Sequence, residues 1–229
     1  YDKQACKIIP FPDTRLLDKG INYMAADKED NIWIGAGNTI YRCNSTASIA
    51  REYDIFGSQQ NKHVINFVYQ DREGNMWVLT GGGLFRYDDK SDSFITYPPL
   101  GRNNAPYTMY QDQSGNYWIG TWGEGLWQFF PKKEGEECYK RHHIINSRSG
   151  ETEPIFYSMT QDNTFGYLWL LSYNELYALQ YTEEGTLVSV DIHDLVDTHM
   201  MYTKIMKDRE GNLWLGSYDM AYTIFFDNS

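Results

Sequence analysis

One motif recurs along this chain and limits what it can fold into: an Asp, a short turn and a Trp on an apolar segment. The third copy, from Asp112 to Gly120, reads Asp-Gln-Ser-Gly-Asn-Tyr-Trp-Ile-Gly. The five Trp residues stand 41 to 51 residues apart; they are Trp33, Trp77, Trp118, Trp169 and Trp214. The Asp residues that precede them are Asp27, Asp71, Asp112, Asp162 and Asp208. A period of this length is typical of a β-propeller, in which each copy forms one four-stranded blade.

The second copy shows the four expected strands most clearly. Apolar and aromatic residues at 64–70, 76–80, 84–87 and 93–97 are separated by turns rich in Gly and Asp. We therefore predict an all-β fold, a β-propeller of four-stranded antiparallel blades with five repeats. The blades are expected at about 21–54, 64–100, 107–145, 155–193 and 201–229, with an outer strand for the last blade from 6–11.

The repeated Trp and Asp residues are predicted to be structural. A large flat side chain fills the wedge between two twisted sheets, and the turn Asp accepts backbone hydrogen bonds while the turn Gly adopts a positive φ. A catalytic site needs different groups that converge on one point, so an Asp that recurs in every copy is a poor candidate for one.

Composition and charge exclude several partners. The formal net charge is −11 and no Lys/Arg-rich stripe is present, so we expect no nucleic-acid partner. No apolar run approaches the roughly 18 residues that span a bilayer, so we expect no direct membrane contact. The three cysteines, Cys6, Cys43 and Cys138, lack the short spacing of metal ligands. We predict no metal site and no cofactor.

The third copy also resembles a known repeat. Its Asp-x-x-Gly-Asn-x-Trp-Ile-Gly-Thr segment, followed by Gly-Leu and an aromatic residue at 129, is similar to the two-component regulator propeller repeat. The other copies depart from it at single positions. Asp30 replaces the turn Gly in the first copy, and Leu79 and Leu171 replace the small Gly after the Trp in the second and fourth.

The resemblance implies a role in signalling. Such repeats are typical of the periplasmic sensor regions of hybrid two-component systems in Bacteroidetes, whose larger chains carry a membrane helix, a histidine kinase and a DNA-binding output. Members commonly sense breakdown products of complex polysaccharides. The chain is then expected to be a periplasmic ligand-sensing module of a membrane-anchored receptor, with no enzymatic activity of its own, and to contact other blades or domains of that receptor.

Two arrangements of the repeats remain open. Residues 1–12 resemble the end of a third strand and a fourth strand, and the last copy stops before its own fourth strand. The segment from Cys6 to Phe11 could close a five-bladed ring, which removes exposed strand edges. Alternatively, the chain is a fragment of a larger propeller whose edges pair with another copy as a homodimer.

A ligand is expected on the face that holds the loops between second and third strands. Three of these loops place an aromatic residue beside a carboxylate or an amide, which suits a sugar because its C–H face stacks on a ring while its hydroxyls bind polar groups. The candidate ligand-binding residues are Trp122, Glu124, Tyr173, Asn174, Tyr218 and Asp219. The first strands carry polar or aromatic residues that could line a central channel or simply hydrate it: Asn22, Asn66, Tyr107, Tyr157 and Thr203. An oligosaccharide or another small ligand is the predicted partner.

Two other functions compete with sensing. A five-bladed glycoside hydrolase needs two carboxylates about 5 to 10 Å apart across a sugar, and only Glu124, Glu175 and Asp219 are placed to serve. The five His residues, including the adjacent pair His142 and His143, are expected in irregular connections and give no catalytic series. The third possibility is a structural or dimerising array, in which a strand edge or a flank is the functional surface.

Overall fold

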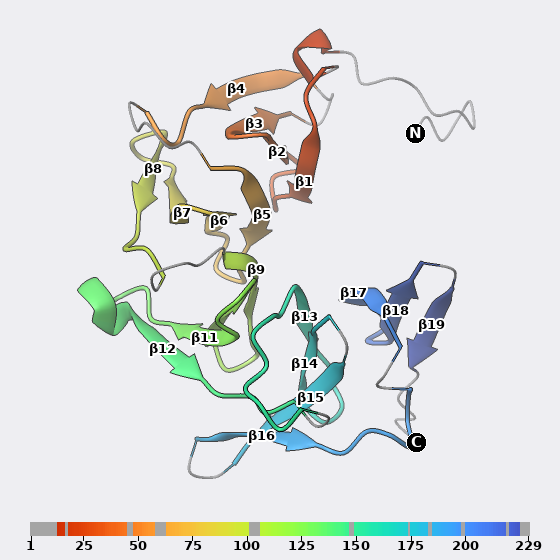
Figure 1. Ribbon diagram of the computed structural model, residues 1–229. Coiled ribbons are helices and arrows are strands. Elements are labelled where there is room, and N and C mark those ends of the chain that lie inside the picture. The colour runs from red at the N-terminus through yellow and green to blue at the C-terminus, as the bar shows by residue number, and fades with distance from the viewer. Residues whose placement is uncertain are drawn as a thin grey trace. The chain divides into compact units, whose positions relative to one another are not determined.

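The computed structural model describes residues 13–16, 18–44, 48–57, 63–100, 106–146, 149–173, 175–182, 185–197, 200–218 and 220–224. Over these residues the chain forms five antiparallel sheets, one for each copy of the motif (Figure 1). It also has two short 3-10 helices, η1 (Thr14–Leu16) and η2 (Gly135–Cys138). The predicted fold class, a β-propeller built from five blade repeats, is confirmed. The outer strand predicted from 6–11 lies outside the described residues.

The chain divides into two compact units, one of residues 1–80 and 85–96 and the other of residues 81–84 and 97–229. The first is called here the two-blade unit. Its first sheet has the strands β1 (Ile21–Ala26), β2 (Ile32–Ala36), β3 (Thr39–Cys43) and β4 (Ile49–Tyr53) in sequential order. Its second sheet has β5 (Ile65–Gln70), β6 (Met76–Thr80), β7 (Gly83–Asp88) and β8 (Ser93–Thr96).

The second, three-blade unit contains the last three sheets. The strands of the third sheet are β9 (Pro106–Gln111), β10 (Tyr117–Thr121), β11 (Leu126–Phe129) and β12 (Tyr139–His142). Those of the fourth are β13 (Ser158–Gln161), β14 (Leu168–Leu171), β15 (Leu176–Tyr181) and β16 (Leu187–Val190). The last sheet has three strands among the described residues, β17 (Tyr202–Lys207), β18 (Leu213–Ser217) and β19 (Ala221–Ile224).

Each copy of the motif closes on itself through a hydrogen bond from the Trp to the Asp. The indole Nε1 of Trp118 donates to Oδ2 of Asp112 at 2.9 Å, and the other four copies repeat this contact at 2.8–2.9 Å. The other carboxylate oxygen accepts backbone N–H groups of the turn, as Asp112 does from Asn116 at 2.8 Å. We call this arrangement the Trp–Asp clamp.

The clamp has electrostatic and conformational consequences. The hydrogen bond from Trp214 holds the pKa of Asp208 below its usual value. At Asp27, burial pushes the pKa upward, but the hydrogen bonds from Trp33 and Asn31 outweigh it and the net pKa is lowered. The turn requires a positive φ at its fourth position; Gly115 has φ 85°, and Asp30, which replaces Gly in the first copy, adopts φ 62°.

The Trp residues also fill the space between consecutive sheets inside each unit. In the two-blade unit Trp33 packs with Val78 and Phe85 of the next sheet. In the three-blade unit Trp118 packs with Leu168 and Leu170. A similar cluster surrounds Trp169; it includes Ile205, Leu213 and Leu215. Four of the Trp side chains are at most 1% exposed, whereas Trp214 on the last blade is 40% exposed.

Gly120 shows why the position two residues after the Trp favours Gly. A Cβ atom at Gly120 would lie 2.5 Å from the carbonyl oxygen of Phe156, in the segment that leads to the next blade. Gly35 meets Ile65 in the same way, at 2.6 Å from its Cγ2. At Gly216, on the last blade, the nearest atom would be 3.8 Å away. The small residue is therefore needed in the first and third copies, whereas Leu79 and Leu171 occupy the same position in the second and fourth.

One expectation about the histidines was wrong. His142 is not in an irregular connection: it ends β12, pairs with Leu126, and lies with its ring 5.1 Å from that of Trp118. Burial, followed by the charges of Lys140 and His143, lowers the pKa of His142 to about 4. Two of the three cysteines, Cys43 and Cys138, are buried free thiols, and Cys6 lies outside the described residues.

Candidate functional site

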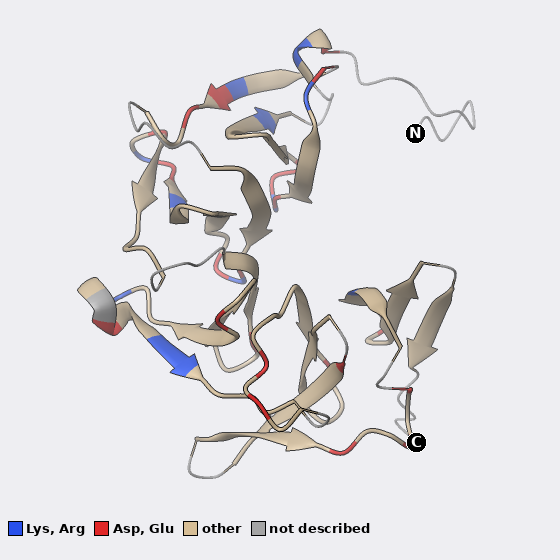
Figure 2. Cartoon of the chain, in the orientation of Figure 1, with Lys and Arg blue, Asp and Glu red and all other residues tan. Residues whose placement is uncertain are grey.

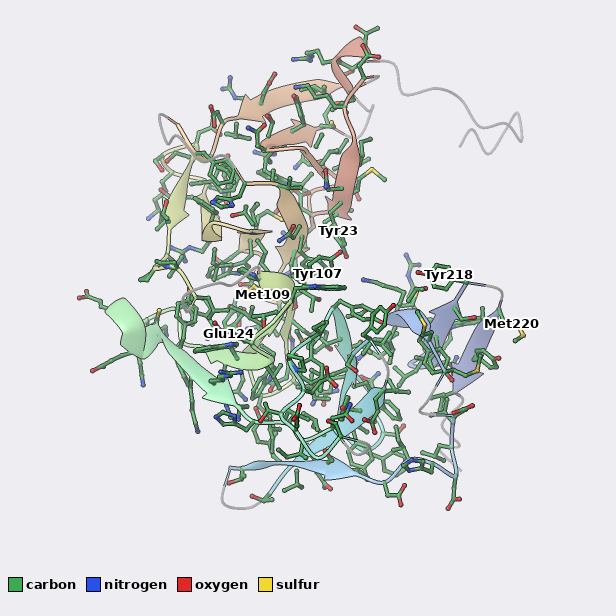
Figure 3. All side chains as sticks on the ribbon, in the orientation of Figure 1. Tyr23, Tyr107, Met109, Glu124, Tyr218 and Met220 are labelled. Carbon is green, nitrogen blue, oxygen red and sulfur yellow. The ribbon has the colours of Figure 1, made fainter. Side chains whose placement is uncertain are left out.

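The loops between second and third strands of the three-blade unit carry exposed aromatic residues. Trp122 is 47% exposed, Tyr173 50% and Tyr218 80%. They follow β10, β14 and β18, so each blade of the unit supplies one. Glu124 is partly exposed beside Trp122, whereas Asn174 and Asp219, the other two predicted ligand residues, lie outside the described residues. Figure 3 labels Glu124 and Tyr218 on this unit.

Two residues expected to line a central channel join these loop residues. The ring centroids of Tyr107 and Trp122 lie 5.5 Å apart, and those of Trp122 and Tyr157 lie 6.4 Å apart. Burial raises the pKa of Tyr157 to about 12, with smaller contributions from the nearby phenols of Tyr218 and Tyr173. Tyr107 and Tyr218 come from the first and last blades of the unit and both lie at its upper side in Figure 3.

Ring contacts join Tyr107, Trp122 and Tyr157, and the phenols of Tyr173 and Tyr218 lie near enough to Tyr157 to affect its pKa. We call these five residues the aromatic cluster. The sequence placed them in two separate groups, loop residues and channel residues, and the structure brings the two groups together. The remaining channel candidates behave differently. Asn22 and Thr203 are exposed, Asn66 is half-buried, and none of the three is aromatic.

A hydroxyl residue three positions after the Trp holds each of these loops. The Oγ1 of Thr121, which is fully buried, donates to the carbonyl oxygen of Gly125 at 2.9 Å and accepts the backbone N–H of Glu124 at 3.0 Å. Ser172 accepts the N–H of Glu175 at 3.2 Å, and Ser217 accepts that of Met220 at 3.1 Å. This role was missed from the sequence, although the regular spacing of Ser or Thr after the Trp was a signal for it.

The Trp122 loop is also fastened to the segment that connects the third and fourth blades. The backbone N–H groups of Gly123 and Gly125 both donate to the carbonyl oxygen of Pro154, at 2.9 and 2.8 Å. Trp122 forms a β-bridge with Ile155. Gly125 has φ 79°, and a Cβ atom there would lie 2.7 Å from the carbonyl oxygen of Glu153. Trp122 is therefore presented by a loop whose backbone is fixed at several points.

The carboxylates named for a hydrolase do not form an exposed pair among the described residues. Glu175 is only 5% exposed, and Tyr177 donates to its Oε2 at 2.9 Å. Glu124 is the one partly exposed member, and Asp219 lies outside the described residues. No group of three or more His, Cys, Asp or Glu side chains that could hold a metal ion occurs in the part of the chain that the structure describes.

Basic and acidic residues are distributed over several blades among the described residues (Figure 2). Figure 2 shows Lys and Arg as short separate segments on several blades, with no continuous basic stripe among the residues drawn in colour. No helix in the described ranges has the length and apolar character needed to cross a bilayer.

Comparison with known proteins supports the resemblance seen in the motif. Residues 100–123 and 197–219 match the family described as "Two component regulator propeller". These segments contain the first and second strands of the third and fifth blades. No curated protein matches the chain.

Several solved structures share the fold. The extracellular domain of BT3049, assigned to a hybrid two-component system of B. thetaiotaomicron, superposes with a TM-score of 0.72 at 19% identity, over 99% of this chain and 30% of that one. The corresponding domain of BT4673 gives 0.66 at 20% identity, over 91% and 28%. A catalytically inactive virginiamycin B lyase from Staphylococcus aureus, solved with quinupristin, gives 0.64 at 14% identity, over 95% and 73%.

The chain thus spans about a third or less of the extracellular domains that it resembles. At these identities the structures show a shared propeller fold, and the fold occurs in extracellular domains of two-component systems and in a lyase alike. Two of the five copies thus match the two-component regulator propeller repeat, which confirms the resemblance seen in the third copy, and the other three copies have the same Asp and Trp positions.

Proposed function

We propose that the chain is a ligand-sensing part of the extracytoplasmic region of a two-component receptor, located in the periplasm, and that its ligand is an oligosaccharide. The aromatic cluster carries this proposal. Its rings come from three consecutive blades, and four of its five members are between 39% and 80% exposed. Exposed aromatic side chains this close together suit a ligand with several flat C–H faces.

The cluster supplies stacking surfaces, and the same loops supply hydrogen-bonding groups. Glu124 lies two residues from Trp122 and can accept from sugar hydroxyls, while the phenols of Tyr107 and Tyr218 can donate and accept. The loop backbones are fixed by Thr121 and its counterparts, so little order has to be gained when a ligand binds. A rigid loop with an adaptable polar rim is well suited to recognising a short glycan.

The test is a binding experiment with a panel of plant and host oligosaccharides, measured by calorimetry on this chain and on the longer receptor ectodomain proposed to contain it. Trp122→Ala and Tyr218→Ala are expected to weaken binding about tenfold or more, which corresponds to ~1.4 kcal/mol. Phe165→Ala is the matched control, because Phe165 is 56% exposed but lies in the turn between β13 and β14, outside the aromatic cluster. Equal affinities for the wild type and the Trp122 variant would refute the site.

The last blade favours a second role as an assembly face. A hollow of about 490 Å³ lies beside Trp214; its lining residues are Lys204, Met206, Asp208, Trp214, Leu215, Gly216 and Ala221. In the preceding copies of the three-blade unit the equivalent Trp is covered by apolar strand residues of the next blade. We propose that another blade of the same repeat covers this hollow, either from the same receptor or from a second copy of the chain.

Light scattering after size-exclusion chromatography separates these two sources. A dimer that Trp214→Glu converts to a monomer supports pairing between copies. A monomer that persists in both proteins supports a blade of the same receptor, and the hollow should then be buried in the full ectodomain, where the fluorescence of Trp214 resists quenching by acrylamide. Free access of acrylamide to Trp214 in both forms would refute the assembly face.

A further inference from the structure

The chain around Tyr157 is bonded to all three blades that carry the aromatic cluster. Tyr157 lies directly before β13, at the point where the chain passes from the third blade to the fourth. Its ring centroid lies 6.4 Å from that of Trp122. Hydrogen bonds made at residues 156–158 connect this point to each blade that presents an exposed ring on a loop.

Two consecutive backbone N–H groups bind the first two of these blades. The N–H of Phe156 donates to the carbonyl oxygen of Thr121 at 2.9 Å, at the base of the Trp122 loop. The N–H of Tyr157 donates to the carbonyl oxygen of Leu171, which ends β14 at the base of the second loop, at 3.1 Å. Both bonds are made by the backbone, so they do not depend on the side chain at position 157.

The third loop is bound through a side chain instead. The phenol of Tyr157 donates to the carbonyl oxygen of Tyr202, which begins β17 of the last blade. Tyr202 is paired with Ser217 on β18, and the Oγ of Ser217 accepts the N–H of Met220 at 3.1 Å, which holds the Tyr218 loop. A single phenol proton therefore ties the fourth blade to the strand pair that carries this loop.

A second side-chain contact crosses the same junction from the next residue. The Oγ of Ser158, which is 1% exposed, accepts the N–H of Ile205 at 3.2 Å and donates to its carbonyl oxygen at 3.3 Å. In Figure 1, β13 and β17 lie side by side. Ile205 is paired with Leu215, further along β17 than Tyr202. Ser158 therefore fixes the middle of β17, and the phenol fixes the end nearest the third loop.

At the equivalent position of three other blades, the side chain binds within its own blade. The side chains of Asn22 and Thr203 each form a hydrogen bond of 3.1 Å with the backbone of their own blade. Tyr107 has its ring contact with Trp122, which also belongs to the same blade. The phenol tie at Tyr157 thus belongs to one junction, between the fourth and fifth blades, and is not a property of the repeat.

We propose that Tyr157 is a positioning residue that sets the spacing between the Trp122 and Tyr218 loops, and that the affinity of the aromatic cluster for a glycan depends on this spacing. The inference rests on the proposed function of the cluster. The two loops belong to different blades, and the phenol bond to Tyr202 holds the last blade at the face where the rings are exposed. Without this bond the Tyr218 ring samples more positions, and binding has to supply the lost order.

Tyr157→Phe separates this role from packing, because it keeps the ring beside Trp122 and removes only the phenol. Amide hydrogen exchange of the folded chain, read at single residues by nuclear magnetic resonance, reports each loop separately. The N–H of Met220 is expected to exchange about fivefold faster, the factor that corresponds to one neutral hydrogen bond. The N–H groups of Gly123 and Gly125, which are held by the connecting segment, should keep the wild-type rate.

Two further variants serve as controls for this measurement. Tyr107→Phe removes a phenol of the same cluster that is 39% exposed, and it should leave the exchange rates of both loops unchanged. Ser158→Ala removes the other contact of the junction, and it should accelerate exchange first at the N–H of Ile205, whose acceptor is lost.

The link to binding is measured by calorimetry with cellohexaose, xylohexaose and maltohexaose as probes. Tyr157→Phe is expected to weaken the binding of a probe about fivefold in the wild type and to have no effect in Tyr218→Ala, because Tyr157 acts through the Tyr218 loop. In Trp122→Ala the fivefold loss should remain. A side chain that only packs in the core would give the same loss in all three backgrounds.

No acceleration at Met220, or an equal acceleration at Met220 and Gly123, would overturn the proposal, because the variant would then act on neither loop or on the whole unit. A loss of affinity that is as large in Tyr218→Ala as in the wild type would overturn the link to binding. Absence of binding by all three probes counts against the proposed function, whereas the exchange measurement uses no ligand and still decides the role of Tyr157.

Discussion

Replacing Trp118 by Phe tests the Trp–Asp clamp most directly. The substitution removes the indole N–H that donates to Asp112 at 2.9 Å and shrinks a side chain that is 0% exposed. A hydrogen bond to a buried carboxylate contributes ~1.5–3 kcal/mol, and the smaller ring leaves a cavity that adds ~1 kcal/mol. We therefore expect Trp118→Phe to lower the free energy of unfolding by about 3 kcal/mol.

Trp214→Phe is the matched comparison, because the last copy has the same clamp in a different environment. Trp214 donates to Asp208 at 2.8 Å, but it is 40% exposed. Water can replace the lost donor and little apolar surface is removed from the interior, so the expected loss is about 1 kcal/mol. Both residues belong to the three-blade unit, which keeps the comparison within one compact part of the chain.

The assay is urea-induced unfolding followed by far-ultraviolet circular dichroism, with the slope of the transition checked for each variant. The reasoning requires the Trp118 variant to lose about 2 kcal/mol more than the Trp214 variant. Equal losses would show that the hydrogen bond to Asp dominates and that burial between blades adds nothing. A larger loss for Trp214→Phe would contradict the assigned role of the interior Trp altogether.

Three further outcomes follow from the same structure. Gly120→Ala should destabilise the chain by ~2–3 kcal/mol, because the new Cβ atom would overlap the backbone of Phe156. Gly216→Ala, at the equivalent position of the last blade where no atom lies so close, should change stability by less than ~0.5 kcal/mol. Urea unfolding measures both. Thr121→Ala removes one buried and one partly buried hydrogen bond and should cost ~1–3 kcal/mol, with faster amide hydrogen exchange at Glu124. The pKa of His142 in the folded chain is about 4, below the ordinary value of 6.5. The unfolded chain therefore binds the extra proton, and stability falls as the pH decreases from about 6.5 to 4. His142→Gln should remove up to ~3 kcal/mol of this loss, measured by unfolding at a series of acid pH values.

The fold could be read from the sequence because its determinants repeat. The spacing between Asp112 and Trp118 recurs in every copy with at most one extra residue, and that regularity is enough to indicate a blade. The hydrogen bond between the two side chains was not foreseen, since a turn Asp and a core Trp each have a sufficient explanation alone. The fixed separation was the available signal, because it places both side chains on adjacent ends of one hairpin.

The candidate site was only partly readable. Trp122 and Tyr218 follow a repeated strand, so their loops could be assigned to one face from the pattern. Tyr107 lies in β9, which pairs with β10 of the same blade, whereas Tyr157 directly precedes β13. The approach of Tyr157 to Trp122 therefore depends on how consecutive blades are packed. The contact of segment 153–155 with the Trp122 loop could not be found from the pattern, because this segment lies in the connection between β12 and β13, outside the repeated strands.

The Trp–Asp clamp spans only six or seven residues, so each copy contains both halves of its own fastening. Contacts this close in sequence form early, which allows a hairpin to take its final shape before any neighbouring blade exists. A gene segment that encodes one copy therefore encodes both partners of its clamp. Duplication or loss of a copy changes the number of blades without altering the hairpins that remain, and the array can lengthen or shorten during evolution while each blade is inherited complete.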